Sequence, residues 1–79
     1  MSPTIFRSAG LRFYFFSREE ARCHVHVASS RGEAKFWLEP RIELGHNRGL
    51  NARELRTARR LIEEHAAQIT SAWKRHLAR

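Results

Sequence analysis

Two stretches near the middle of the chain alternate apolar and polar residues with the two-residue period of a β-strand. They span residues 23–28 and 33–38, and the four residues between them, Ser29 to Gly32, are polar or small and end in glycine. If these residues form a loop, the two stretches pair as an antiparallel hairpin of defined register. The expected cross-strand pairs are Ala28 with Glu33, His26 with Lys35, and His24 with Trp37. In this register the apolar residues of both stretches fall on one face, so each pattern supports the other.

Further short strands are expected on both sides of this hairpin. They span residues 5–7, 11–16 and 42–44. The first two are joined by the three-residue connection Ser8-Ala9-Gly10, in which the glycine is expected to take the left-handed position of a bulge. The polar segment 17–22 is predicted to be a loop or a single helical turn. A second loop is expected at residues 45–49, after the last strand.

From residue 51 the apolar period changes to that of a helix. Asn51, with Glu54 three residues later, is typical of a helix N-cap and its capping-box partner. The apolar stripe that follows contains Leu55, Ala58, Ile62, Ile69, Trp73 and Leu77. Because the stripe is continuous, we expect one long helix to about residue 77, although a break near residues 65–67 is the alternative. The side of this helix that faces solvent carries Arg53, Arg56 and Arg60.

These elements predict a single α+β domain over residues 1–79. Its expected architecture is an antiparallel meander of four to five strands with one long C-terminal helix packed on one face.

Positive charge is the main compositional signal. Fifteen Lys and Arg against eight Asp and Glu give a net charge of +7, and thirteen of the cations are arginine, whose planar fork suits phosphates and carboxylates. We therefore expect a polyanion or an acidic protein as partner. The single cysteine excludes an internal disulfide, and the sequence shows neither a membrane span nor a signal peptide. These observations predict a cytoplasmic protein that is not bound to membranes.

The sheet face opposite the expected helix combines cations with aromatic rings. Its predicted members are Arg12, Tyr14, Phe16, His24, His26, Lys35 and Trp37. This composition is typical of surfaces that bind single-stranded nucleic acid, where bases stack and phosphates pair with cations. It is equally typical of protein interfaces. A protein partner, a second copy of the chain and nucleic acid, with RNA favoured over DNA, therefore remain alternatives.

An enzymatic alternative uses the same face. His24 and His26 could divide the roles of acid and base in metal-independent cleavage of RNA, while Lys35 or Arg12 stabilises the phosphorane. A zinc site would need a third ligand, such as Glu20, Glu33 or His46, so we expect neither a metal nor another cofactor.

Two further residues require an interpretation. Arg48, in the predicted loop before the helix, could bind a phosphate beside the helix N-terminus, although an ordinary capped turn is the commoner outcome. Cys23 lies beside His24 in sequence, but the alternation places its side chain in the core, so we do not expect a nucleophile there.

Several short motifs are familiar when taken together. The segments PTIFR, HVHV, GEAKFWLEP, NRG and ARELR occur in an order that resembles domain of unknown function family 4160, over nearly the whole chain. The resemblance implies a small bacterial protein encoded beside a second small gene, as in toxin–antitoxin pairs, without an assigned activity. Its partner would be the product of that neighbouring gene, and this implied gene context favours a protein partner or a homodimer slightly over nucleic acid.

The chain departs from this family at one motif. The family usually has His-Pro-Pro-Pro directly before the motif His-Val-His-Val. This chain has EARC at residues 20–23 instead, so only His24 and His26 are shared. We therefore favour a small basic binding protein of a toxin–antitoxin-like module, and the alternative is a metal-independent endoribonuclease.

Overall fold

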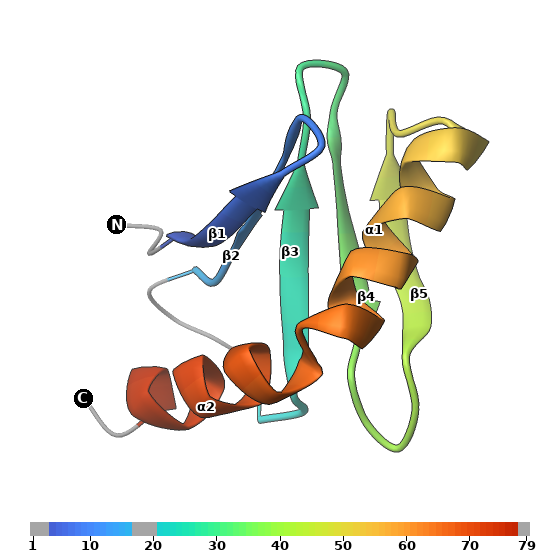
Figure 1. The fold of residues 1–79 in the computed structure, drawn as a ribbon. Helices are drawn as coiled ribbons and strands as arrows, with labels where there is room; N and C mark the ends of the chain where they lie inside the picture. Colours follow the sequence, from blue (N-terminus) through green and yellow to red (C-terminus); the bar gives the residue numbers. More distant parts are fainter. Residues whose placement is uncertain (1–3, 17–20, 78–79) are drawn as a thin grey trace.

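One antiparallel sheet and two helices make up the described part of the chain (Figure 1). The computed structural model describes residues 4–16 and 21–77. Its strands are β1 (Thr4–Ser8), β2 (Leu11–Tyr14), β3 (His24–Ala28), β4 (Glu33–Trp37) and β5 (Glu43–Arg48). Each strand pairs with the next along the chain, so the predicted α+β meander is confirmed. Most of the loop or turn predicted at residues 17–22 lies outside the described residues.

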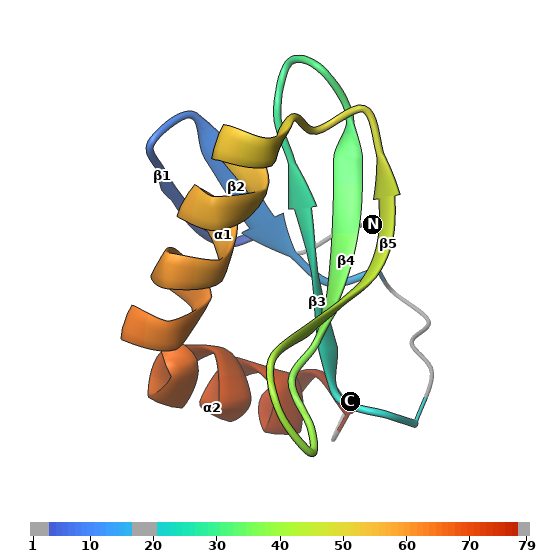
Figure 2. The same cartoon turned by 90° about the vertical axis from the view of Figure 1, so that its right-hand side faces the viewer.

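The helices leave the two faces of the sheet unequal. Helix α1 (Ala52–Glu64) lies over one face, and α2 (Ala66–Leu77) runs across the end of the sheet at which β3 begins (Figures 1 and 2). Among the described residues, no helix covers the other face (Figure 2). We call this surface, formed by the outward side chains of β2 to β5, the helix-free face.

The hairpin between β1 and β2 is tighter than predicted. Ser8 pairs with Leu11, so Ala9 and Gly10 alone form the loop. Both have positive φ angles, 53° and 77°, as in a type I′ turn, whose twist matches that of the strands it joins. The three-residue connection predicted from the sequence is therefore wrong.

The register of β3 and β4 is confirmed. Ala28 faces Glu33, His26 faces Lys35 and His24 faces Trp37. Alternation then sends the apolar residues of both strands toward α1, where they join the helices in one core. The buried members of that core include Phe13, Cys23, Val25, Val27, Ala34, Phe36, Ala58, Leu61, Ile62, Ile69 and Trp73.

Strand β5 is longer than predicted and includes most of the segment expected as a loop. Lys35 pairs with His46 and Phe36 with Leu44, so Gly45 is an extra residue in the ladder. A bulge of this kind is a common place for glycine. A Cβ on Gly45 would lie 2.7 Å from Nε1 of Trp37, so the indole can pack on the backbone because this residue has no side chain.

The start of α1 is as predicted. The Asn51 side chain accepts from the Glu54 backbone N–H at 2.8 Å, and the Glu54 carboxylate accepts from the Asn51 N–H at 3.0 Å. This reciprocal capping box satisfies two backbone donors that the helix itself leaves unpaired. The arginines predicted to face solvent, Arg53, Arg56 and Arg60, are all exposed.

The prediction of one long helix is wrong, because the helix breaks at His65. This residue has φ −113° and ψ 20°, outside the helical range. Its Nδ1 donates to the Leu61 carbonyl at 2.9 Å, and its ring stacks on Phe6 of β1 at 4.4 Å. The break turns α2 across the end of the sheet, which brings Ile69 and Trp73 into the core.

The turn at Ala9 provides a test of the first hairpin. Ala9→Asn should raise the free energy of unfolding by about 0.5–1 kcal/mol, because asparagine tolerates the left-handed conformation better than alanine. Urea denaturation measures this as a higher midpoint at unchanged slope. The control, Ser8→Asn, changes a paired strand residue and should not stabilise. A lower midpoint for Ala9→Asn would contradict the two-residue turn.

Candidate functional site

One row of side chains crosses four strands of the helix-free face. Cross-strand partners are Tyr14 in β2 with His26 in β3, His26 with Lys35 in β4, and Lys35 with His46 in β5. Because directly opposed residues of antiparallel strands point to the same side of a sheet, these four residues are neighbours. The row therefore places a lysine residue between two histidines.

Aromatic rings hold His26 in place. Its ring is stacked with Tyr14 at a centroid distance of 5.4 Å and lies 4.2 Å from Phe16. Tyr14 and His26 are only 5% and 9% exposed, whereas Phe16 is 41% exposed. The Tyr14 hydroxyl donates to the Glu33 carboxylate at 3.3 Å. The imidazole thus keeps a fixed orientation beside an accessible aromatic ring.

His24 is enclosed rather than accessible. It is 1% exposed, and its ring meets Trp37 of β4 at 5.5 Å and Trp73 of α2 at 5.1 Å. Its Nδ1 donates to the Arg22 carbonyl at 2.7 Å, since a carbonyl oxygen can only accept. Although its ring lies 5.0 Å from that of His26, this burial places His24 among packing residues. The sequence had placed both histidines on an accessible surface, and it did not predict the cover that Trp73 provides.

Cations lie over the rings of this face. The Arg12 guanidinium is 4.4 Å from the Tyr14 ring centroid, while Arg22 and Lys35 lie 4.2 Å and 4.4 Å from that of Trp37. Such contacts place positive charge on the ring face, where the π-system attracts it. The long side chains also cover apolar surface that no helix of the described part protects.

A hollow of about 410 Å³ opens on the helix-free face. Its lining residues are Phe16, His26, Glu33, Ala34, Lys35, Gly45, His46 and Arg48. It brings together four of the predicted site residues: Phe16, His26, Lys35 and Arg48. The other four lie outside this lining: Arg12, Tyr14, His24 and Trp37.

Sequence reasoning did not include His46 and Glu33 in the predicted binding or catalytic set. His46 was expected in a loop, because Gly45 and Asn47 on either side of it are typical turn residues. The signal that could have found it is the alternation from His46 to Arg48, which continues the strand once Gly45 is recognised as a bulge. His46 and Arg48 are exposed in β5, whereas Glu33 is partly buried in β4.

Arg48 is also positioned differently from the prediction. It ends β5 opposite Glu33 and lines the hollow. The Asn47 side chain donates to the Leu50 carbonyl at 3.0 Å and accepts from its N–H at 3.1 Å. These two bonds order the connection into α1, which is the capped-turn arrangement that the sequence made the commoner outcome.

Metal ligands and the cysteine complete the chemistry of this region. Among the described residues, no three or more His, Cys, Asp or Glu side chains gather as a metal site would require. Cys23 lies in the core, as predicted. Burial, with a smaller contribution from the charge of Glu39, raises the pKa of its thiol to about 11. The thiol is therefore protonated at neutral pH and is a poor nucleophile.

The fold and the hollow define a small, basic α+β protein with a site on the uncovered face of its sheet. The family model described as Domain of unknown function (DUF4160) matches residues 10–74, and the chain belongs to this family. The resemblance seen in the sequence motifs is thereby confirmed. Searches of curated proteins and of solved structures gave no significant match. In the part of the chain that the structure describes, neither helix is long and apolar enough to cross a membrane.

The enclosure of His24 leads to a prediction about stability. His24→Ala should lower the free energy of unfolding by about 2 kcal/mol or more, because it leaves a cavity and removes a buried hydrogen bond. His46→Ala, at an exposed position, should change it by less than about 0.5 kcal/mol. Urea denaturation of both variants measures the difference. Equal effects would mean that His24 is not enclosed as described.

The raised pKa of Cys23 predicts a dependence of stability on pH. Above about pH 9 the thiol ionises in the unfolded chain but not in the folded one. Its contribution to stability is therefore complete below about pH 9 and is lost as the pH rises toward 11. Between about pH 8 and about pH 10, the denaturation midpoint should fall more for wild type than for Cys23→Ala. Parallel pH dependence in the two proteins would contradict the burial of this thiol.

Proposed function

We propose that this protein binds single-stranded RNA on its helix-free face. The observation that carries the proposal is the composition of the hollow. Three neighbouring strands contribute His26, Lys35, His46 and Arg48 to one lining, with the half-exposed ring of Phe16 at its border. Cations beside an accessible aromatic ring are the combination that binds a flexible nucleic-acid strand.

Electrostatics support an anionic strand as the ligand. The chain carries a net charge of +7, and Arg12 and Arg22 lie over rings on the same face as the hollow. A phosphate backbone releases counterions when it meets such cations, and this release supplies much of the affinity.

Phe16 supplies the second part of the recognition. Its ring is 41% exposed and packs on His26 at 4.2 Å and edge-on to Tyr14 at 5.6 Å. A ring held from behind presents a firm surface on which a base can stack, and stacking of this kind contributes about 1–3 kcal/mol per base.

Glu33 favours ribose over deoxyribose. A carboxylate in a basic hollow would repel a phosphate, but it can accept a hydrogen bond from a 2′-hydroxyl. Glu33 lies in the lining beside Lys35 and opposite Arg48. This residue therefore supports RNA as the ligand.

A module of two genes, which the resemblance to the family implies, is compatible with this function. One product of a toxin–antitoxin-like pair would bind RNA in the cytoplasm, and the other would bind the first. A partner protein is thus the competing occupant of the helix-free face, and the binding experiment separates the two ligands.

The test measures fluorescence anisotropy of a labelled single-stranded RNA of about 12 nucleotides. Wild type should bind it, and Arg48→Ala should weaken binding and reduce the slope of log affinity against log salt by about 1. Phe16→Ala should cost about 1 kcal/mol or more, because base stacking is lost.

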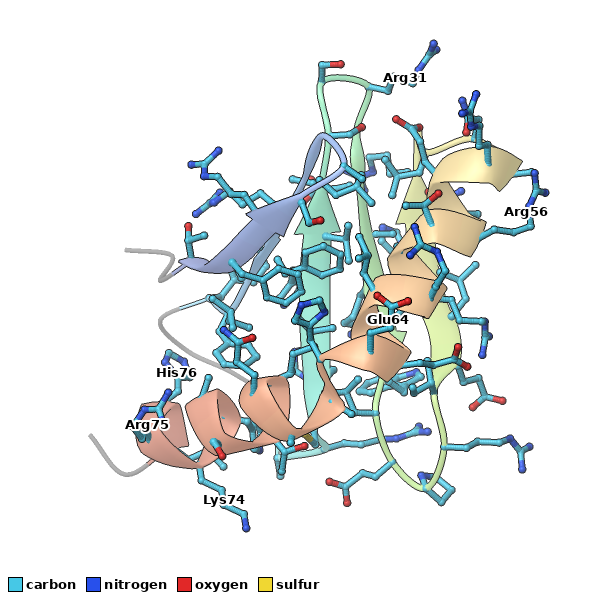
Figure 3. All side chains as sticks on the ribbon, viewed as in Figure 1. Arg31, Arg56, Glu64, Lys74, Arg75 and His76 are labelled. Carbon is cyan, nitrogen blue, oxygen red and sulfur yellow. The ribbon has the colours of Figure 1, made fainter. Side chains whose placement is uncertain are left out.

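The matched control is Arg56→Ala. Arg56 is an exposed arginine of α1, which lies over the other face of the sheet, and it does not line the hollow (Figure 3). The variant Arg56→Ala removes the same charge as Arg48→Ala but should leave the affinity for RNA within about twofold of wild type. Equal losses for the two variants would locate binding away from the hollow. Absence of RNA binding by wild type would direct the search to a protein partner.

A further inference from the structure

The row on the helix-free face contains a second imidazole that the sequence did not place there. His26 and His46 are both cross-strand partners of Lys35, one on each side of it. Two spacings between strands separate them, about 9.5 Å of backbone, and both line the hollow. His24, the partner of His26 in the sequence hypothesis, is 1% exposed, whereas His46 is open to solvent.

Building on the proposed binding of RNA, we propose that the hollow also cleaves RNA without a metal. His26 and His46 act as the acid–base pair, and Lys35 between them stabilises the phosphorane. A phosphate group together with one hydrogen bond of about 2.8 Å at each of its ends has a length that matches the distance between the two strands. A pair of imidazoles is a common arrangement for general acid–base catalysis, in which one ring accepts a proton and the other donates one.

The reaction is a transesterification that needs no other reactant. The neutral imidazole takes the proton of the 2′-hydroxyl as that oxygen forms a bond to phosphorus. The bond from phosphorus to the 5′-oxygen breaks, and the imidazolium gives its proton to this leaving oxygen. The products are a 2′,3′-cyclic phosphate and a 5′-hydroxyl end. No water is consumed, and the two histidines have exchanged protonation states.

The surroundings favour these roles for the two residues. Tyr14 and Phe16 fix the ring of His26, so that its orientation is set before substrate binds. Lys35 extends on a flexible stem from β4, which lies between the strands of the two histidines, and its Nζ rests 4.4 Å from the Trp37 centroid. The charge on this stem can move to the equatorial oxygens of a phosphate bound between the histidines.

The experiment incubates labelled RNA with purified protein in EDTA and identifies the product ends. Wild type should produce 2′,3′-cyclic phosphate ends. His26→Gln and His46→Gln should each slow cleavage by about a hundredfold or more. The control His76→Gln changes a histidine near the end of α2 (Figure 3) and should cleave as wild type does. Loss of cleavage in the other two variants, purified in the same way, excludes a contaminating nuclease.

Two further measurements separate cleavage from binding and from folding. The 2′-fluoro form of the same strand lacks the nucleophile, and His46→Gln should bind it within about twofold of wild type. The rate should depend on pH as a bell, and each histidine variant should lose one limb. The charged or titratable groups facing the pair are Tyr14, His24 and Lys35 around His26, and Glu33, Lys35 and Arg48 around His46.

The outcomes are distinct. Intact RNA with normal binding of the 2′-fluoro strand would overturn cleavage and leave the proposed binding in place. Cleavage by His46→Gln at the wild-type rate would overturn the assignment of His46. Neither binding nor cleavage by wild type would overturn both proposals.

Discussion

The site depends on how β5 is paired to β4. In a sheet with one packed face, a slip of one residue sends every side chain of a strand to the other side. The extra residue at Gly45 shifts the ladder by one position between Phe36–Leu44 and Lys35–His46. This shift brings His46 and Arg48 onto the helix-free face, while Leu44 stays on the side of α1. Gly45 lines the hollow, and the indole of Trp37 packs on it because this residue has no side chain.

The two faces of the sheet differ in chemistry. Toward α1 lies an apolar core, and on the helix-free face lies a layer of rings covered by arginine and lysine side chains. Such a layer reduces the exposed apolar area without a second helix. It also concentrates positive charge on one surface. The same packing that protects the rings therefore gives this surface the positive charge that the proposed binding of RNA requires.

Local patterns in the sequence predicted the parts of the fold that depend on neighbouring residues. The register of β3 and β4 follows from two alternating stretches and a short loop, and the start of α1 follows from Asn51 and Glu54. The extent of β5 could not be predicted in this way, because Gly45 and Asn47 are typical of turns and the indole that requires the glycine is on another strand. The break at His65 leaves the apolar stripe in phase, so the helical period did not reveal it.

For the candidate site, the pairing of His26 with Lys35 was predictable. The burial of His24 depends on Trp73, far along the chain, and the position of His46 depends on the bulge.

The contact of Trp73 with His24 joins the last helix to the site. Trp73 touches the His24 ring, which touches the His26 ring, and His26 lines the hollow. Three rings in succession thus connect α2 to a surface on the other side of the sheet. Loosening of α2 would open the space beneath His26 and release its fixed orientation. A protein that captured the C-terminal helix would in this way change the geometry of the opposite face without ever covering it.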